Sequence, residues 1–300
     1  MSTYTPGAQS RAYHRLPRGE RGELIKEINR LFAEKSGVTR KLHPTSAADR
    51  ELRHEWLRIR DEVMDEKIIE EDMEFRRGLF VSDLAGIVIE DMNALRWTEA
   101  AELLKTWSER PPTIKPKFTA PVTDVVKMDW VLTFQRAKTV YDKILSDRIW
   151  TNDASRKRIA EMLKKKSRGT GQSFGDLSRA VTAVDEEWIN SRPVSGGFSF
   201  DALAGALGSF HLQVAISGTV VSRGTSDFEV SIGEVGIYAK DGFHFNDSDF
   251  LGFWGHRDEP VNDSDFRQWR TENNAGGDFL VFSDIKRTKL SPPDRVKGSM

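Results

Sequence analysis

The sequence predicts an α+β protein, with a helical N-terminal half and a C-terminal antiparallel β-sheet or part-barrel. Through about the first 190 residues, apolar side chains recur at the three-to-four-residue spacing of amphipathic helices. After Gly196 and Gly197 the period changes to two, and apolar and polar residues alternate over 210–217 and again over 228–233. Two later apolar runs, 250–254 and 279–285, are also typical of strands.

The first part of the chain, residues 1–110, is predicted to be a helical N-terminal region. An apolar stripe over 24–32 predicts one amphipathic helix, and sparser apolar positions over 46–77 predict a longer one with a narrow packed face. Ser82 and Thr98 each precede an apolar helical pattern in the position of an N-cap, which predicts two shorter helices.

Four prolines between positions 111 and 121 are incompatible with a helix or an interior strand, so we predict a Pro-rich linker over 111–127. Helical spacing resumes near Met128, and Asp153 is an expected N-cap, so residues 128–190 form a second helical segment. Residues 191–300 then form the β-rich domain. We therefore expect four consecutive regions.

Composition excludes several classes of chemistry. The 45 Lys and Arg residues balance 46 Asp and Glu residues, so no overall basic excess indicates nucleic acid or anionic lipid. The chain has no cysteine, which excludes disulfides, thiol nucleophiles and thiolate metal sites. No apolar window reaches the roughly 18 residues of a membrane span, and no apolar segment follows the early arginines as in a secretory signal.

One dense basic cluster lies over residues 156–168. It permits contact with nucleic acid, but cations also stabilise the last turn of a helix, and charge runs are usually solvated helix faces. No aromatic residues alternate with these cations as in a single-strand binder. We therefore expect no nucleic-acid partner, and keep that binding as an alternative.

The richest polar stretch runs from 240 to 249 and is followed by His256 and Arg257. Its carboxylates would hold a hard divalent cation through oxygen ligands. Arg257 would bind a phosphate group, and His244 would act as acid or base. Asn, Asp and Ser also dominate ordinary turns between strands, so a purely structural loop is the alternative.

Several strings in order along residues 80–290 resemble an uncharacterised bacterial family, a domain of unknown function often encoded beside type VI secretion components. They include KMDWVL at 127–132, VGIYAKD at 235–241, FLGFW at 250–254 and GGDFLVFSD at 276–284. The resemblance implies an antibacterial effector that is cytoplasmic in the producer and is secreted into the periplasm of target cells. It also implies two partners, a secretion-system spike or adaptor protein and a cognate immunity protein.

A fainter resemblance links the β-rich effector domain to colicin M-like bacteriocins, which cleave lipid II at its pyrophosphate junction with a divalent cation. Their signature, Asp-x-Tyr-Asp-Phe at a strand end, is similar to residues 241–245 of this chain. The sequence departs from the signature at Phe243, which lacks the tyrosine hydroxyl, and at His244, which replaces the second aspartate. With these departures, the alternative is a domain of this fold without hydrolase activity.

The resemblance implies roles for four residues. Asp241 would be the essential carboxylate and would bind Mg²⁺ together with Asp247, with Asp249 as the alternative to Asp247. His244 would be the general base or a metal ligand, and Arg257 would bind the pyrophosphate of lipid II or a related lipid. The alternative is a non-catalytic effector, adaptor or binding protein of the secretion system.

Overall fold

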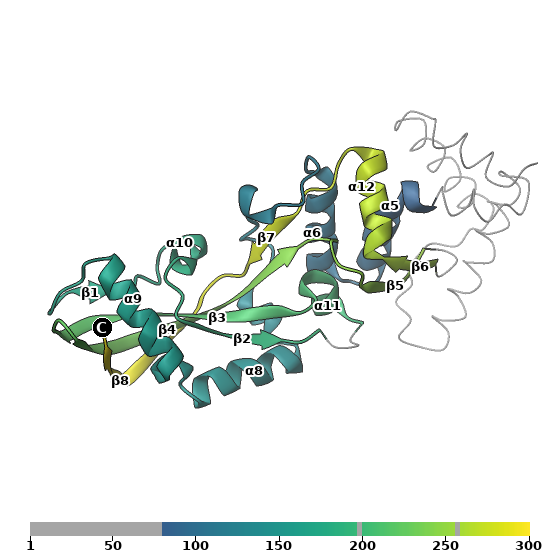
Figure 1. The fold of residues 1–300 in the computed structure, drawn as a ribbon. Coiled ribbons are helices and arrows are strands. Elements are labelled where there is room, and N and C mark those ends of the chain that lie inside the picture. Colours follow the sequence, from purple (N-terminus) through teal and green to yellow (C-terminus); the bar gives the residue numbers. More distant parts are fainter. Residues whose placement is uncertain (1–79, 197–199, 256–258) are drawn as a thin grey trace, which may run out of the picture. The chain divides into compact units, whose positions relative to one another are not determined.

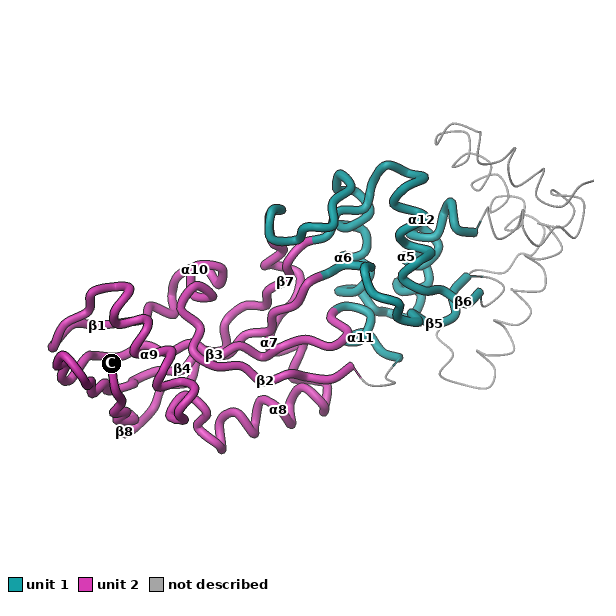
Figure 2. Tube along the Cα trace, viewed as in Figure 1, with its two compact units in different colours: residues 1–119, 200–206, 243–278 teal, residues 120–199, 207–242, 279–300 magenta. Residues whose placement is uncertain are grey.

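The computed structural model describes residues 80–196, 200–255 and 259–300, and divides the chain into two compact units (Figures 1 and 2). Unit 1 comprises 1–119, 200–206 and 243–278, and unit 2 comprises 120–199, 207–242 and 279–300. Both units gather separated segments. The region 191–300 therefore contributes to both units, unlike the consecutive division expected from the sequence, and the helices predicted over 24–32 and 46–77 lie outside the described residues.

The predicted α+β class is confirmed, with helices in the N-terminal half and a curled antiparallel sheet, a half-barrel, in the C-terminal half. Unit 2 contains this sheet and the helices packed against it (Figure 1). Its helices are α7 (Met128–Val131), α8 (Gln135–Ser146), η2 (Ile149–Thr151), α9 (Asp153–Lys165) and α10 (Val181–Asp185). Its strands are β1 (Ser173–Phe174), β2 (Asn190–Val194), β3 (Phe210–Arg223), β4 (Asp227–Phe243), β7 (Phe279–Phe282) and β8 (Lys286–Ser299).

The six-stranded sheet has the order β1-β3-β4-β7, with β2 also paired to β3 and β8 also paired to β4. The β3–β4 hairpin forms its centre and is longer than the predicted strands, because pairing continues past a bulge at Ser217 and Gly218. A Cβ atom on Gly218 would lie 2.0 Å from the carbonyl oxygen of Ser231, so only glycine fits there.

Alternation along β3 explains how the sheet is covered. Ala215 faces a cluster that includes Tyr238 and the α10 residues Val181 and Val184, whereas its neighbour Val214 is buried on the opposite face. Apolar side chains lie on both faces at this point, so the sheet packs against other elements on both sides.

Unit 1 is mainly helical and carries a second, two-stranded sheet (Figure 2). Its elements are α5 (Leu84–Ala94), α6 (Thr98–Glu109), η1 (Pro116–Phe118), α11 (Ala202–Leu207, ending at the unit boundary), β5 (Phe250–Trp254), β6 (Glu259–Asn262) and α12 (Asp263–Asn273). Trp107 is fully buried, and its ring contacts those of Phe245, Phe266 and Trp269 with centroids 4.8, 5.7 and 5.4 Å away. This aromatic cluster joins α6 to α12.

Two expected helix starts are nearly correct. Helix α5 begins at Leu84, with Asp83 rather than Ser82 in the N-cap position, and α6 begins at Thr98 itself, with Trp97 as its N-cap. Neither cap forms a side-chain hydrogen bond to its helix. The helix expected from Met128 is divided into α7 and α8.

The Pro-rich segment is partly paired rather than only a linker. Within unit 1, Thr113 forms a parallel bridge with Gly277, and within unit 2, Val122 forms one with Val281. None of the helices in the described part of the chain has the length and apolar character that a membrane-spanning helix requires.

Candidate functional site

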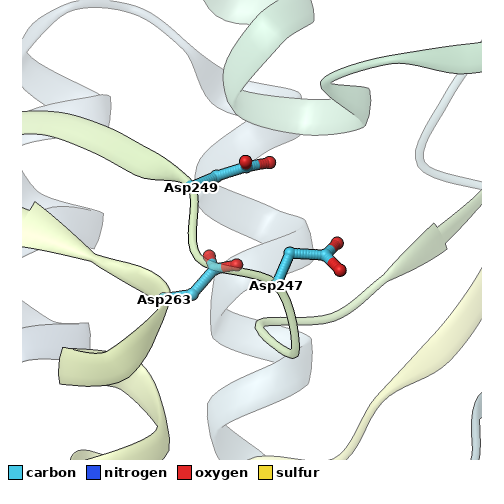
Figure 3. Close-up of side chains that lie close together, drawn as sticks. All are labelled: Asp247, Asp249 and Asp263. Atoms are coloured by element: carbon cyan, nitrogen blue, oxygen red, sulfur yellow. The ribbon is translucent and has the colours of Figure 1, made fainter.

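Three aspartates of unit 1 bring their carboxylates together: Asp247, Asp249 and Asp263. One oxygen atom from each lies within 4.8 Å of the others (Figure 3). Asp247 and Asp249 belong to the segment between β4 and β5, whereas Asp263 is the first residue of α12. Asp263 is buried and the other two are exposed, so the cluster lies at the surface with one ligand atom set deeper.

The β5–β6 hairpin explains why these distant aspartates meet. Phe250 pairs with Asn262, and one residue further along the backbone N–H of Asp263 donates a 3.1 Å hydrogen bond to the carbonyl oxygen of Asp249. Helix α12 starts immediately afterwards because Asn262 and Asp265 form a capping box, with the Asn262 N–H donating to the Asp265 carboxylate at 2.9 Å.

Arg267, on α12, binds the loop 244–249 that carries Asp247 and Asp249. Its Nη1 atom donates to the carbonyl oxygens of Phe245 and Asp247, at 3.0 and 2.6 Å. Arg267 lies one helical turn after Asp263, and its charge lowers the pKa of the Asp263 carboxyl.

The electrostatics of the cluster favour a cation. Burial is the main cause that raises the pKa of Asp263, and the charges of Asp249 and Asp247 raise it further. A hydrogen bond from the Asp249 backbone and the charge of Arg267 act in the opposite direction. Three carboxylate oxygens form the donor set that a hard divalent cation such as Mg²⁺ or Ca²⁺ prefers, so these residues fit such an ion.

His244 lies beside the cluster. Its Nδ1 atom is 3.8 Å from the nearer carboxylate oxygen of Asp247 and is buried, with no hydrogen-bond partner among the described residues. The imidazole is about one-third exposed, with a side-chain exposure of 34%. A histidine beside the cluster can act as an acid or base toward a group that is bound there.

The structure brings together only some of the predicted site residues. Asp247 belongs to the cluster and His244 lies next to it, whereas Asp241 lies on β4 in unit 2 and is not part of the carboxylate group. Desolvation by burial raises the pKa of Asp241 well above its usual range. Arg257 lies outside the described residues, so its predicted role stays a prediction.

Sequence reasoning assigned no role to Asp263, and it named Asp249 only as the alternative to Asp247 for a cation ligand. The available signal for Asp263 was the Asn262-x-x-Asp265 pattern, which marks the start of a helix. That helix start would have placed Asp263 in the first turn of a helix. In the structure, Asp249 directly precedes β5 and Asp263 directly follows β6, so both lie at the open end of the β5–β6 hairpin.

Comparison with known proteins identifies a family but no characterised relative. No curated protein and no solved structure matches the chain. A family model described as a family of unknown function, DUF6402, matches residues 83–259 and 257–298. Since these segments cover more than half of the sequence, the chain belongs to the DUF6402 family.

Proposed function

We propose that this protein is an antibacterial effector that acts in the envelope of target cells by cation-dependent cleavage of lipid II or a related lipid pyrophosphate. The observation that carries the catalytic part is the convergence of the Asp247, Asp249 and Asp263 carboxylates. The delivery by type VI secretion and the choice of substrate rest on the sequence resemblances described above. Within this proposal Asp241 stays the essential carboxylate but is not a ligand of the cation, which the cluster would hold. Arg257 keeps its predicted role.

The residues around the cluster suit hydrolysis at a phosphate group. Asp247, Asp249 and Asp263 would hold the cation, which supplies Lewis acidity at a phosphoryl oxygen. His244, whose imidazole is partly exposed, would take the proton from the attacking water. The water oxygen bonds to phosphorus, the P–O bond to the leaving group breaks, and the leaving oxygen takes up a proton.

A non-catalytic effector, adaptor or binding protein is the second candidate, and one observation favours it. Phe250 and Phe253 on β5 are 55% and 56% exposed, and their rings are in edge-to-face contact with centroids 5.2 Å apart. Neighbouring exposed aromatics are typical of binding surfaces. A binding protein would need these side chains and would tolerate loss of the carboxylates.

Turnover of purified lipid II separates the two candidates. The full-length protein is incubated with lipid II and Mg²⁺, and the released lipid and sugar-pyrophosphate products are measured. Asp249→Asn should lower the rate at least 100-fold, because it replaces one of the three charged cation ligands with a neutral amide. Ser248→Ala, at the exposed position between two of the aspartates, is the matched control and should keep the wild-type rate. Absence of Mg²⁺-dependent turnover by the wild type would favour the binding protein.

A further inference from the structure

Asp278 is a fully buried carboxylate that connects three separate segments of unit 1. Its Oδ1 atom accepts a 3.0 Å hydrogen bond from the indole Nε1 of Trp107 on α6, and also pairs with Arg270 on α12. Its Oδ2 atom accepts a 2.7 Å hydrogen bond from the side-chain Nδ2 of Asn246. Asn246 belongs to the same loop as the candidate site and immediately precedes Asp247.

The backbone of Asp278 is held as firmly as its side chain. Its N–H donates to the carbonyl oxygen of Thr113 at 2.9 Å, and its own carbonyl accepts a 2.8 Å hydrogen bond from the Thr119 hydroxyl. Groups outside the loop 244–249 therefore hold both the backbone and the carboxylate of Asp278.

Burying the charges of Arg270 and Asp278 costs desolvation free energy, which opposes the attraction between them. Burial lowers the pKa of Arg270, and only the interactions with Asp278 counter this effect. Buried pairs of this kind are often replaceable by apolar side chains without loss of stability, and some serve to select one conformation. Here the Arg270 guanidinium also lies over the Trp107 ring, 5.3 Å from its centroid, and its Nη1 atom is 3.5 Å from Asn246 Oδ1.

We infer that Asp278 is a positioning residue of the candidate site: through Asn246 it fixes the loop 244–249 against α6 and α12, in addition to the hydrogen bonds that the loop accepts from Arg267. The hydrogen bonds of the Asp278 carboxylate go to Asn246, Trp107 and Arg270, so its effect on the carboxylates of the cluster passes through Asn246. The consequence for cation binding rests on the proposed function, whereas the fixing of the loop does not.

Amide hydrogen exchange of the full-length protein, without added metal, tests the inference. Asn246→Ala removes the loop's bond to Asp278 and should make exchange at 245–249 at least tenfold faster, while exchange in α5 stays unchanged. A uniform increase over both segments would indicate general destabilisation and would overturn the inference. Unchanged exchange at 245–249 would overturn it as well. Ser248→Ala, in the same loop, is the control and should leave both segments unchanged.

A reciprocal exchange of side chains makes the test specific. Asn246→Asp places a second carboxylate against Asp278, and Asp278→Asn removes the partner of Arg270, so each single variant should lose loop protection or fail to fold. The double variant should regain at least half of the lost protection, because the new amide at position 278 would then donate to the new carboxylate at position 246. Arg270 would also remain within reach of a carboxylate. No recovery would contradict the inference.

Binding of Mn²⁺, followed by electron paramagnetic resonance, separates this inference from the proposed function. If the wild type binds Mn²⁺, Asn246→Ala should weaken the affinity at least threefold, and an unchanged affinity would contradict a positioning role at the site. If the wild type does not bind Mn²⁺, the proposed function fails, and the exchange measurement still decides whether Asp278 fixes the loop.

Discussion

The backbone N–H of Asp263 donates a 3.1 Å hydrogen bond to the carbonyl oxygen of Asp249, which extends the β5–β6 ladder by one step. That step places two aspartates side by side at the open end of the hairpin, and Asp247 joins them from the preceding loop. The Arg267 guanidinium donates to the carbonyl oxygens of Phe245 and Asp247, and its charge offsets only part of the repulsion that raises the pKa of Asp263.

Cation binding should weaken as the pH falls, and at a higher pH than an ordinary aspartate would require. Burial and the neighbouring carboxylates raise the pKa of Asp263, so its carboxyl takes up a proton before an exposed aspartate does. Titrations with Mn²⁺ between pH 4 and pH 8 measure this effect. An affinity that stays constant until the pH approaches about 4, the range of an unperturbed aspartate, would contradict the role of Asp263.

The same raised pKa has a consequence for stability without metal. The folded state binds this proton more tightly than the unfolded state does, so protonation of Asp263 increases the free energy of unfolding. This contribution is complete below the unfolded-state pKa and is lost as the pH rises through the folded-state pKa. At pH 7 the ionised carboxyl is therefore a cost, and Asp263→Asn should raise Tm, by about 2–4 °C for each kcal/mol of cost removed. The gain should disappear near pH 3. The account would be contradicted if the difference in Tm between Asp263→Asn and the wild type were smaller at pH 7 than at pH 3.

Asp241→Asn should keep the fold and the cation affinity but abolish toxicity when the protein is directed to the periplasm. Desolvation raises the pKa of Asp241 well above its usual range, so a neutral amide of the same shape fits its surroundings. Circular dichroism, Mn²⁺ titration and killing assays measure the three properties. Full toxicity would show that Asp241 is not the essential carboxylate, and strong killing by the wild type from the cytoplasm would exclude an envelope target.

Gly276→Ala should destabilise the protein by about 2–6 kcal/mol, the sum of backbone strain and overpacking. Gly276 has φ +95, and a Cβ atom there would lie 2.6 Å from the ring of the buried Trp107. Gly169→Ala is the matched control, since its Cβ would meet nothing within 4 Å, and should change stability by less than about 0.5 kcal/mol. Equal Tm values for the two variants, measured by calorimetry, would refute the packing described around Trp107.

Replacing Lys164, Lys165 and Lys166 with alanine should leave toxicity intact and change stability by about 1 kcal/mol or less. All three side chains are exposed at the end of α9, and Lys166 forms a 3.3 Å surface ion pair with Glu187. Binding to DNA and RNA is measured in parallel at several salt concentrations. A salt-dependent affinity of the wild type that this variant loses would support the nucleic-acid alternative instead.

Local patterns in the sequence predicted the elements that depend on local chemistry. Helix α9 begins at Asp153 as expected, with Asn152 accepting a 3.0 Å hydrogen bond from the Ser155 N–H as the actual cap. The alternating strands β3 and β4 also appear. Strand β8 was missed, because prolines and charges obscure the alternation and its edge position tolerates them.

The candidate site was harder to predict because it depends on pairing between segments. Asp247 and His244 were expected at the site and lie together in the structure. Asp263 joins them only because β5 pairs with β6, and β6 and α12 were not predicted. Periodicity gives the buried face of a strand but not its partner strand, so no pattern within the sequence placed Asp263 beside Asp249.

Mn²⁺ binding to the full-length protein at pH 7 tests most directly whether Asp247, Asp249 and Asp263 form a cation site. For the wild type we expect one saturable site per chain with a Kd on the order of 10⁻⁵–10⁻³ M, as in exposed oxygen-ligand sites. Asp249→Asn should weaken this affinity at least tenfold, and Ser248→Ala should not change it. Absence of saturable binding, or equal affinity in wild type and Asp249→Asn, would contradict the account.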